Sequence, residues 1–74
     1  MDRIKVGDVL EFIEPAHAEG KTIARGTKVR VGYIEEEVLE PDVTVVVLDT
    51  NPPQTLTLPR HILSVHCRHL AGRA

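Results

Sequence analysis

The residue types that could do chemistry in this chain gather near its C-terminal end. Imidazole and thiolate groups are good Zn²⁺ ligands, and one short segment supplies His66, Cys67 and His69. On a regular strand His66 and Cys67 point to opposite faces, and only Cys67 and His69 share one. A closed zinc site needs four ligands at defined spacing. We therefore expect no metal site and no cofactor, and keep these three residues as the alternative metal ligands.

Nucleophilic catalysis in this segment would have to use Cys67. A cysteine nucleophile needs a base within hydrogen-bond reach, whereas His66 projects away from it on a regular strand. The carboxylates at 35–37 fall in an expected exposed turn, and the sequence has no G-x-S-x-G, P-loop or H-E-x-x-H motif. A small filled barrel also has little room for a substrate cavity of about 300 Å³. We expect no enzymatic activity and no catalytic residue.

The type of secondary structure that positions these residues is indicated by the many side chains branched at Cβ. Ten Val, five Ile and six Thr make up more than a quarter of the 74 residues. Such side chains lose freedom in a helix and suit a pleated strand. No window of about eleven residues repeats apolar positions at the spacing of one helix face. The composition and the pattern predict an all-β chain.

Alternation of apolar and polar residues predicts five strands. They are residues 9–13, 28–33, 43–48, 55–58 and 63–67. In the second strand the alternation places Val29, Val31 and Tyr33 on one face. The third strand is apolar on both faces except at Thr44, which is typical of a central or covered strand and leaves a homodimer open.

The last expected strand and the first connection carry two further predictions. Leu63, Val65 and Cys67 share the apolar face of that strand, so Cys67 is expected to be a small buried hydrophobic residue. The connection 14–27 is long enough to be functional or mobile, and its residues 15–19 are able to form a single helical turn.

The chain length allows one domain, residues 1–70, followed by a flexible tail at 71–74. Five short strands cannot form two well-packed sheets, but they can curl into a small barrel around one core. Pro59 suits the start of a 3₁₀ turn, because its φ is fixed and its missing N–H is not needed there. The predicted fold is a five-stranded barrel with a long first loop and a 3₁₀ turn before the last strand.

This order of elements resembles the SH3-like small-barrel superfamily over residues 4–67. The resemblance is carried by Leu-Pro-Arg-His-Ile-Leu at 58–63, continuing to Val65, and by the glycine and valine pattern of 6–9 and 25–34. Peptide-binding SH3 domains hold PxxP ligands between aromatic rings, whereas this chain has one Phe, one Tyr and no Trp. It looks more like bacterial and plastid accessory barrels: the photosystem I barrel subunit, the barrel chain of ferredoxin–thioredoxin reductase and nitrogenase-assembly accessory proteins.

That resemblance implies a noncatalytic accessory or assembly module that docks on a larger protein or enzyme complex. Charge predicts the surface: residues 21–33 hold four basic side chains and no acid, whereas 34–50 hold six acids and no base. A dipolar surface can orient a partner with an acidic patch. The expected partner-binding residues are His17, Lys21, Arg25, Lys28, Arg30, Arg60 and His61. The alternative is that the basic strand is a solvated face paired with acidic neighbours.

Two other functions stay open, an RNA-binding barrel and a metal-carrying accessory protein. Small barrels bind RNA with a positive groove and two or three stacking aromatic rings. This chain has the basic residues, but only two aromatic residues and a net charge of −2, so nucleic acid is not the expected partner. A single cysteine and the lack of an apolar run of about 18 residues predict a cytoplasmic protein without a membrane partner, as a monomer or a weak homodimer.

Overall fold

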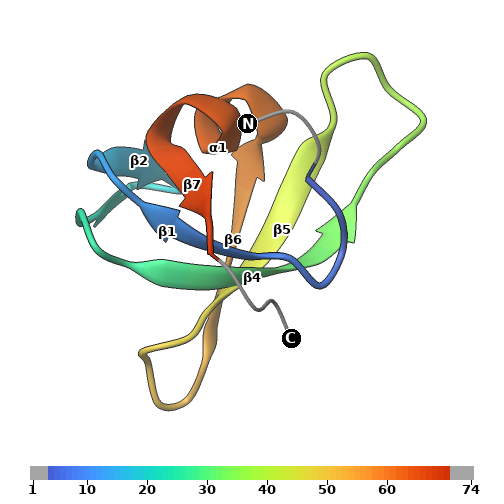
Figure 1. Cartoon of the computed structure of the whole chain (residues 1–74). Coiled ribbons are helices and arrows are strands. Elements are labelled where there is room, and N and C mark those ends of the chain that lie inside the picture. Colours follow the sequence, from blue (N-terminus) through green and yellow to red (C-terminus); the bar gives the residue numbers. More distant parts are fainter. Residues whose placement is uncertain (1–3, 71–74) are drawn as a thin grey trace.

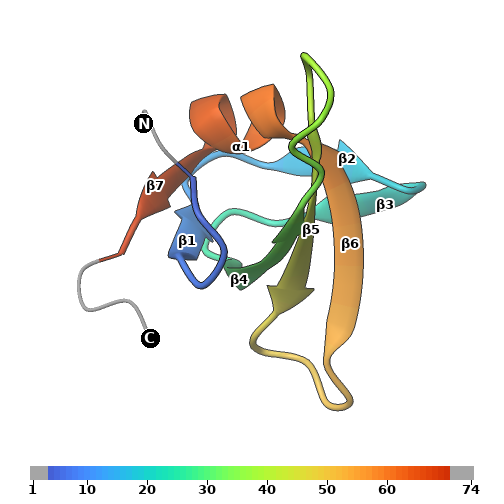
Figure 2. The same ribbon diagram turned by 90° about the vertical axis from the view of Figure 1, so that its right-hand side faces the viewer.

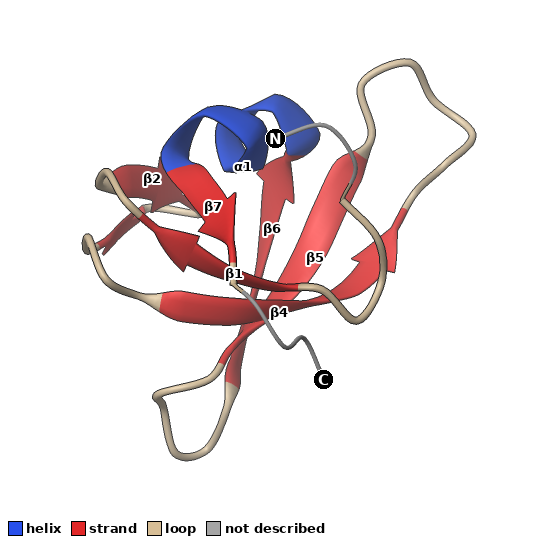
Figure 3. Cartoon of the chain, in the orientation of Figure 1, coloured by secondary structure: helices blue, strands red, loops and turns tan. Residues whose placement is uncertain are grey.

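The computed structural model describes residues 4–70 and is mostly β-structure with one short helix (Figures 1 and 3). This confirms the expected all-β class, while the tail at 71–74 lies outside the described residues. No helix within residues 4–70 is long and apolar enough to cross a membrane. The elements in chain order are β1 (Val9–Phe12), β2 (Ala16–Ala18), β3 (Lys21–Ile23), β4 (Lys28–Ile34), β5 (Asp42–Val47), β6 (Gln54–Pro59), α1 (Arg60–His66) and β7 (Cys67–His69).

Five of the strands form one antiparallel sheet in the order β6-β5-β4-β1-β7, and β2 pairs with β3 as a separate hairpin. Among the described residues no ladder joins β6 to β7, so the sheet is not closed into the barrel expected from the sequence. Figure 2 shows β6 and β7 on opposite sides of the molecule, with α1 above the sheet. The chain therefore covers its core with a helix and a hairpin instead of closing the sheet.

The core lies on the inner face of the curved sheet. Leu10 and Phe12 on β1 are completely buried, and Leu56 and Leu58 on β6 are buried while Thr57 between them faces outward. Strand β5 lies between β4 and β6, which confirms the central position expected for it. Its alternate valines are buried, whereas Val46 on the opposite face is half-buried. The alternation of Val and Thr thus builds one apolar face, as the sequence predicts.

Strand β4 departs from the expected alternation at its C-terminal end. Val29 and Val31 are buried as expected, but Tyr33 is 61% exposed and Ile34 is buried in its place. The pairing of β4 with β5 shifts between Val31 and Tyr33, so Gly32 lies in a β-bulge. A bulge inserts one extra residue and reverses the faces of the residues that follow. The prediction that Tyr33 faces the core is therefore wrong.

The segment expected to be a 3₁₀ turn and a strand is the helix α1. Pro59 caps its N-terminus with extended backbone, φ −61° and ψ 144°, because its ring is tolerated where no N–H is needed. Leu63 is fully buried and Val65 is 63% exposed, since residues two apart lie on nearly opposite sides of a helix. The expected strand 63–67 is wrong, and β7 begins only at Cys67. The burial of Cys67 itself is confirmed.

The long first connection is occupied by the β2–β3 hairpin, so the helical turn expected at 15–19 is wrong. Its two turn residues, Glu19 and Gly20, have positive φ values of 53° and 76°, which is typical of a type I′ hairpin turn. Ala16, Ala18 and Ile23 are buried against the main core. The hairpin is therefore part of the packed structure.

Candidate docking surface

A row of charged side chains crosses the outer face of the main sheet, on the side opposite the core. Glu11 on β1 lies directly across from Lys28 on β4 and from Arg68 on β7. Arg30 follows Lys28 on the same face of β4, because residues two apart on a strand point the same way. We call the cations of this surface the basic face: Arg25, Lys28, Arg30 and Arg68.

Glu11 is held in the middle of the basic face by Arg68. Its Oε1 accepts a hydrogen bond from Nε of Arg68 at 2.9 Å and forms an ion pair with Nη2 of Arg68 at 2.7 Å. The hydrogen bond from the guanidinium lowers the pKa of Glu11 below its ordinary value, partial desolvation opposes this, and the charges of Arg68, Lys28 and Arg25 add to the lowering. Three cations therefore act on one carboxylate, which leaves the basic face with excess positive charge.

A shallow groove of about 280 Å³ lies at one side of the basic face. Arg25 and Arg68 stand at its rim, and Ile13, which is 44% exposed, contributes an apolar wall. The remaining lining residues are Glu11, Phe12 and Gly26. This surface can contact a carboxylate and an aliphatic side chain at the same time.

The expected partner-binding residues do not form one surface. Arg25 and Lys28 both act on the charge of Glu11, and Arg30 shares the strand face of Lys28. His17 and Lys21 lie on the outer side of the hairpin, where the hydroxyl of Thr22 is 3.3 Å from Nδ1 of His17. They lie on β2 and β3, which pair with each other and not with the strands that carry Lys28, Arg30 and Arg68.

The start of α1 adjoins the loop between β4 and β5. Nδ1 of His61 lies 3.6 Å from a carboxylate oxygen of Glu40, and the N–H of Arg60 donates to the carbonyl of Pro41 at 3.0 Å. Arg68, by contrast, belongs to the basic face although sequence reasoning missed it. The misplaced last strand ended at Cys67, so the register that brings Arg68 to Glu11 could not be anticipated.

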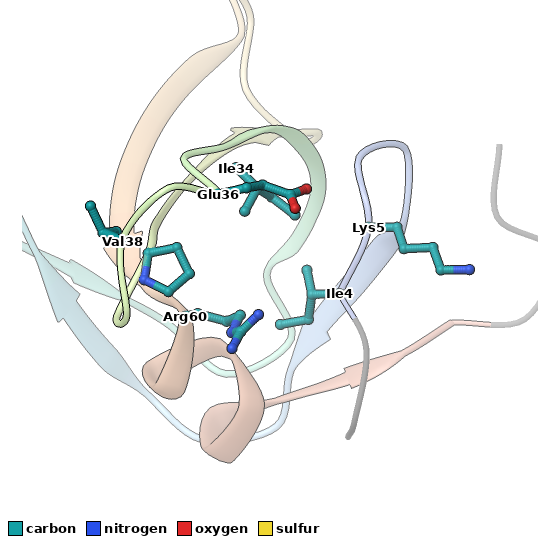
Figure 4. Close-up of a pocket in the computed structure, with 7 residues that line it drawn as sticks. Ile4, Lys5, Ile34, Glu36, Val38 and Arg60 are labelled. Atoms are coloured by element: carbon teal, nitrogen blue, oxygen red, sulfur yellow. The ribbon is translucent and has the colours of Figure 1, made fainter.

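A second groove, of about 720 Å³, lies where the N-terminal segment, the end of β4 and the start of α1 meet (Figure 4). Its apolar lining includes Ile4, Ile34 and Val38, and Glu36 and Arg60 stand on opposite sides of it, while Lys5 points away. The expectation of little room for a substrate cavity concerned the interior of a barrel, whereas this groove is open to solvent and lies on the surface. A projecting loop beside a helix forms it, and the order of strands in the sequence does not predict such a groove.

The three alternative metal ligands do not come together, because His66 and His69 bond to different groups and Cys67 is buried. Nδ1 of His66 donates to the carbonyl of Pro15 at 3.0 Å, and Nε2 of His69 lies 2.8 Å from Oδ2 of Asp8. Burial raises the pKa of the Cys67 thiol to about 12, which disfavours the thiolate that binds metals. Within residues 4–70 no three His, Cys, Asp or Glu side chains gather closely enough to hold a metal ion.

The scan against family models found no match to this chain, and the curated proteins and solved structures yielded none either. Which residues act, and on what kind of partner, is therefore inferred from the charged surfaces and grooves described above. Of these, the basic face combines unbalanced charge, an apolar wall and support from three paired strands.

Proposed function

We propose that this chain is a noncatalytic accessory module that docks on a larger protein or enzyme complex through the basic face. The observation that carries the proposal is the charge imbalance around Glu11. Its carboxylate is already bonded by Arg68, and no ion pair holds Arg25, Lys28 or Arg30 within residues 4–70. An acidic patch on a partner would supply the missing negative charges. The excess positive charge of the basic face would also attract such a partner and raise the rate at which the two proteins associate.

The position of Lys28, Arg30 and Arg68 on regular strands supports a docking role for the basic face. Lys28 and Arg30 are fixed by the ladders that β4 makes with β1 and β5, and their neighbours Val29 and Val31 anchor the same strand in the core. A rigid backbone lowers the entropic cost of binding, because the partner does not have to order a loop. The alternative is that the basic strand is only a solvated face paired with acidic neighbours. One such neighbour is present, Glu11, and its single negative charge balances only part of the positive charge of the basic face.

The observations favour an acidic protein over RNA. RNA-binding barrels stack bases on aromatic rings that share a face with the positive groove. Tyr33 is exposed, but it stands beyond the bulge at the far end of β4 from Lys28, beside the acidic residues that follow. Phe12 is completely buried. The basic face therefore lacks an exposed ring among the described residues that line its groove.

We also propose that the fold is an SH3-like barrel in opened form, and that the module works in the cytoplasm. The order β6-β5-β4-β1-β7, with an excursion between β1 and β4 and a helix before β7, supports the SH3-like assignment. Likeness to the bacterial and plastid accessory barrels remains part of this proposal, and monomer or weak homodimer is the oligomeric state proposed with it.

An affinity pull-down from the native cell tests the docking surface. The bait is the full chain, compared with the triple variant Arg25→Glu/Lys28→Glu/Arg30→Glu. We expect the triple variant to lose the captured protein, because reversing three charges turns steering of an acidic partner into repulsion. The matched control is Lys5→Glu/Lys21→Glu/Arg60→Glu, which reverses three exposed cations outside the basic face.

Thermal melts followed by circular dichroism check that both triple variants fold. The proposal would be supported if the wild type and the control capture the same protein and the Arg25/Lys28/Arg30 variant does not. Undiminished capture by the Arg25/Lys28/Arg30 variant would remove the basic face from the interface. Loss of the captured material on nuclease treatment would favour the RNA-binding alternative instead.

A further inference from the structure

The loop that connects β4 to β5 is both the most acidic and one of the most exposed segments of the chain. Residues 35–40, which we call the acidic loop, carry four glutamates, and Leu39 at the tip is 96% exposed. Figure 1 shows this loop projecting away from the body of the molecule. Pro41, which follows it, is buried and anchors its end to the start of α1. The loop thus presents an apolar side chain surrounded by negative charge.

The acidic loop and the basic face cannot neutralise each other within one molecule. They lie at opposite ends of β4, whose seven residues span about 20 Å at the rise of an extended strand. The Debye length at physiological salt is about 8 Å, so attraction across that distance is largely screened. Among the described residues, the carboxylates of Glu35, Glu36 and Glu37 form no ion pair. The charge of each surface is therefore not balanced by the other surface of the same molecule.

We propose that the acidic loop of one copy of this chain docks on the basic face of a second copy. The glutamates meet Arg25, Lys28 and Arg68, and Leu39 covers the groove of about 280 Å³ that Ile13 lines. Charge complementarity selects this pairing, because like surfaces would bring cations against cations or carboxylates against carboxylates. The groove of about 280 Å³ is large enough for one aliphatic side chain, and the acidic loop projects beyond the neighbouring elements (Figure 2).

The two contacting surfaces are different, so copies can meet either in a two-fold dimer, with each loop on the other copy's basic face, or head-to-tail in a row. In both arrangements the extent of association increases with protein concentration. The contact is small and held largely by exposed charges, and we expect it to be weak and sensitive to salt. The inference rests on the basic face of the proposed function: the acidic loop occupies the surface that an acidic partner needs, so self-docking and partner docking compete.

Sedimentation velocity and amide NMR shifts of the purified full chain test the self-docking. At about 20 mM salt, where the Debye length is about 20 Å, we expect the weight-average sedimentation coefficient to rise with protein concentration. At about 1 M salt, where the Debye length is about 3 Å, it should return to the monomer value. The amide shifts that change with concentration should fall on Ile13, Arg25 and Lys28 and on the acidic loop. A wild type that stays monomeric across the accessible concentrations at low salt would overturn the proposal.

Charge-swap variants decide which surfaces meet. The loop variant Glu36→Lys/Glu37→Lys removes the net charge of the acidic loop, and the face variant Arg25→Glu/Lys28→Glu makes the basic face acidic. Each should lose self-association at least about tenfold, because the attraction between loop and face is removed in the first and becomes repulsion in the second. Mixed together they should associate more than either variant alone, since the two introduced lysines of one meet the two introduced glutamates of the other. The control Glu14→Lys/Asp49→Lys changes net charge equally outside the acidic loop and should associate like the wild type. If the control loses self-association as strongly as the loop variant does, the loss is explained by net charge alone and the proposal is overturned.

Leu39→Ser tests the apolar part of the contact without changing charge. We expect self-association to weaken several-fold, whereas Val65→Ser, at an exposed position on α1, should have no effect. Failure of self-docking is distinguishable from failure of the proposed function. If the wild type does not self-associate but still needs the basic face to capture its partner, only self-docking is rejected. If the loop variant captures the partner better than the wild type, competition for one surface is supported.

Discussion

The two faces of β4 divide the work of this small domain. Val29 and Val31 face inward and are at most 1% exposed, whereas Lys28 and Arg30 on the same strand face solvent. Burial of the inner side chains stabilises the fold by roughly 25 cal/mol per Å² of apolar surface. The outer side chains contribute little to this burial, so they can be substituted by residues of another charge without loss of the core. The difference teaches that stability and recognition can be varied separately here, because strand alternation assigns each to its own face.

The division ends at the bulge of β4. Beyond Gly32 the alternation reverses, so Tyr33 becomes exposed and Ile34 is buried. The strand then continues into the acidic loop, where Val38 and Leu39 are exposed as well. The bulge therefore marks the boundary between the part of β4 whose outward residues are Lys28 and Arg30 and the part that exposes Tyr33 and leads into the acidic loop.

The largest expected effect compares neighbours on opposite faces of β6. Leu58→Ala removes a fully buried side chain and should lower the free energy of unfolding by about 2–5 kcal/mol, since it leaves a cavity in the core. Thr57→Ala, one residue earlier and facing outward, should change it by about 0.5 kcal/mol or less. Urea denaturation of the two variants measures both values. Equal losses would break the distinction between the faces.

A second comparison uses the buried thiol of Cys67. Its pKa is raised to about 12 by burial, so above pH 9 the unfolded chain releases a proton that the folded chain retains. Stability should therefore fall with rising pH between the two pKa values, by at most about 1.4 kcal/mol per pH unit. Denaturation from pH 7 to 10 should show this extra slope in the wild type and not in Cys67→Ala. A thiol that reacts with Ellman's reagent in the native state as fast as a free thiol would refute its burial.

A substitution in the β2–β3 hairpin should have an intermediate effect on the free energy of unfolding, because the exposed side chain of Glu19 is hydrogen-bonded to the main sheet. Its Oε2 accepts a hydrogen bond from the N–H of Thr57 at 2.7 Å, on the edge strand β6. Glu19→Ala should lower the free energy of unfolding by about 1 kcal/mol and speed hydrogen exchange of the Thr57 amide. Glu19→Gln keeps an acceptor oxygen and should stay close to the wild type. Identical exchange rates in the Ala and Gln variants would show that the bond contributes nothing.

The smallest expected effect lies on the basic face. Arg68→Gln removes the hydrogen bond that lowers the pKa of Glu11, so that pKa should rise, as carboxyl NMR titration would measure. A carboxylate with a lowered pKa contributes stability above its ordinary pKa and loses it as pH falls through the folded value. The variant should therefore lose a little stability at neutral pH and none in strong acid. Arg60→Gln, at a cation outside any ion pair within residues 4–70, is the control.

Much of the strand content was predictable because it depends on local periodicity. The inner positions Val29 and Val31 were identified from alternation and are buried. The segment around Val65 was misjudged because five residues with alternating polarity fit a strand and a short helix equally well. Of the basic face, the charge-bearing part of β4 was predicted, but Arg68 was not, since its place depends on pairing with a strand more than fifty residues away.

By itself the sequence determined the class of secondary structure, the inner face of most strands and the segregation of charge along the chain. These follow from side-chain branching and from the two-residue repeat of a strand, which are local properties. Only the tertiary structure decided the bulge in β4, the helix before β7, the hairpin latched to the edge of the sheet and the gathering of cations around Glu11. Those features depend on which strands pair although they are distant in sequence. They also depend on the need to exclude water from the core, because one short open sheet does not enclose it and the helix and the hairpin must cover the rest.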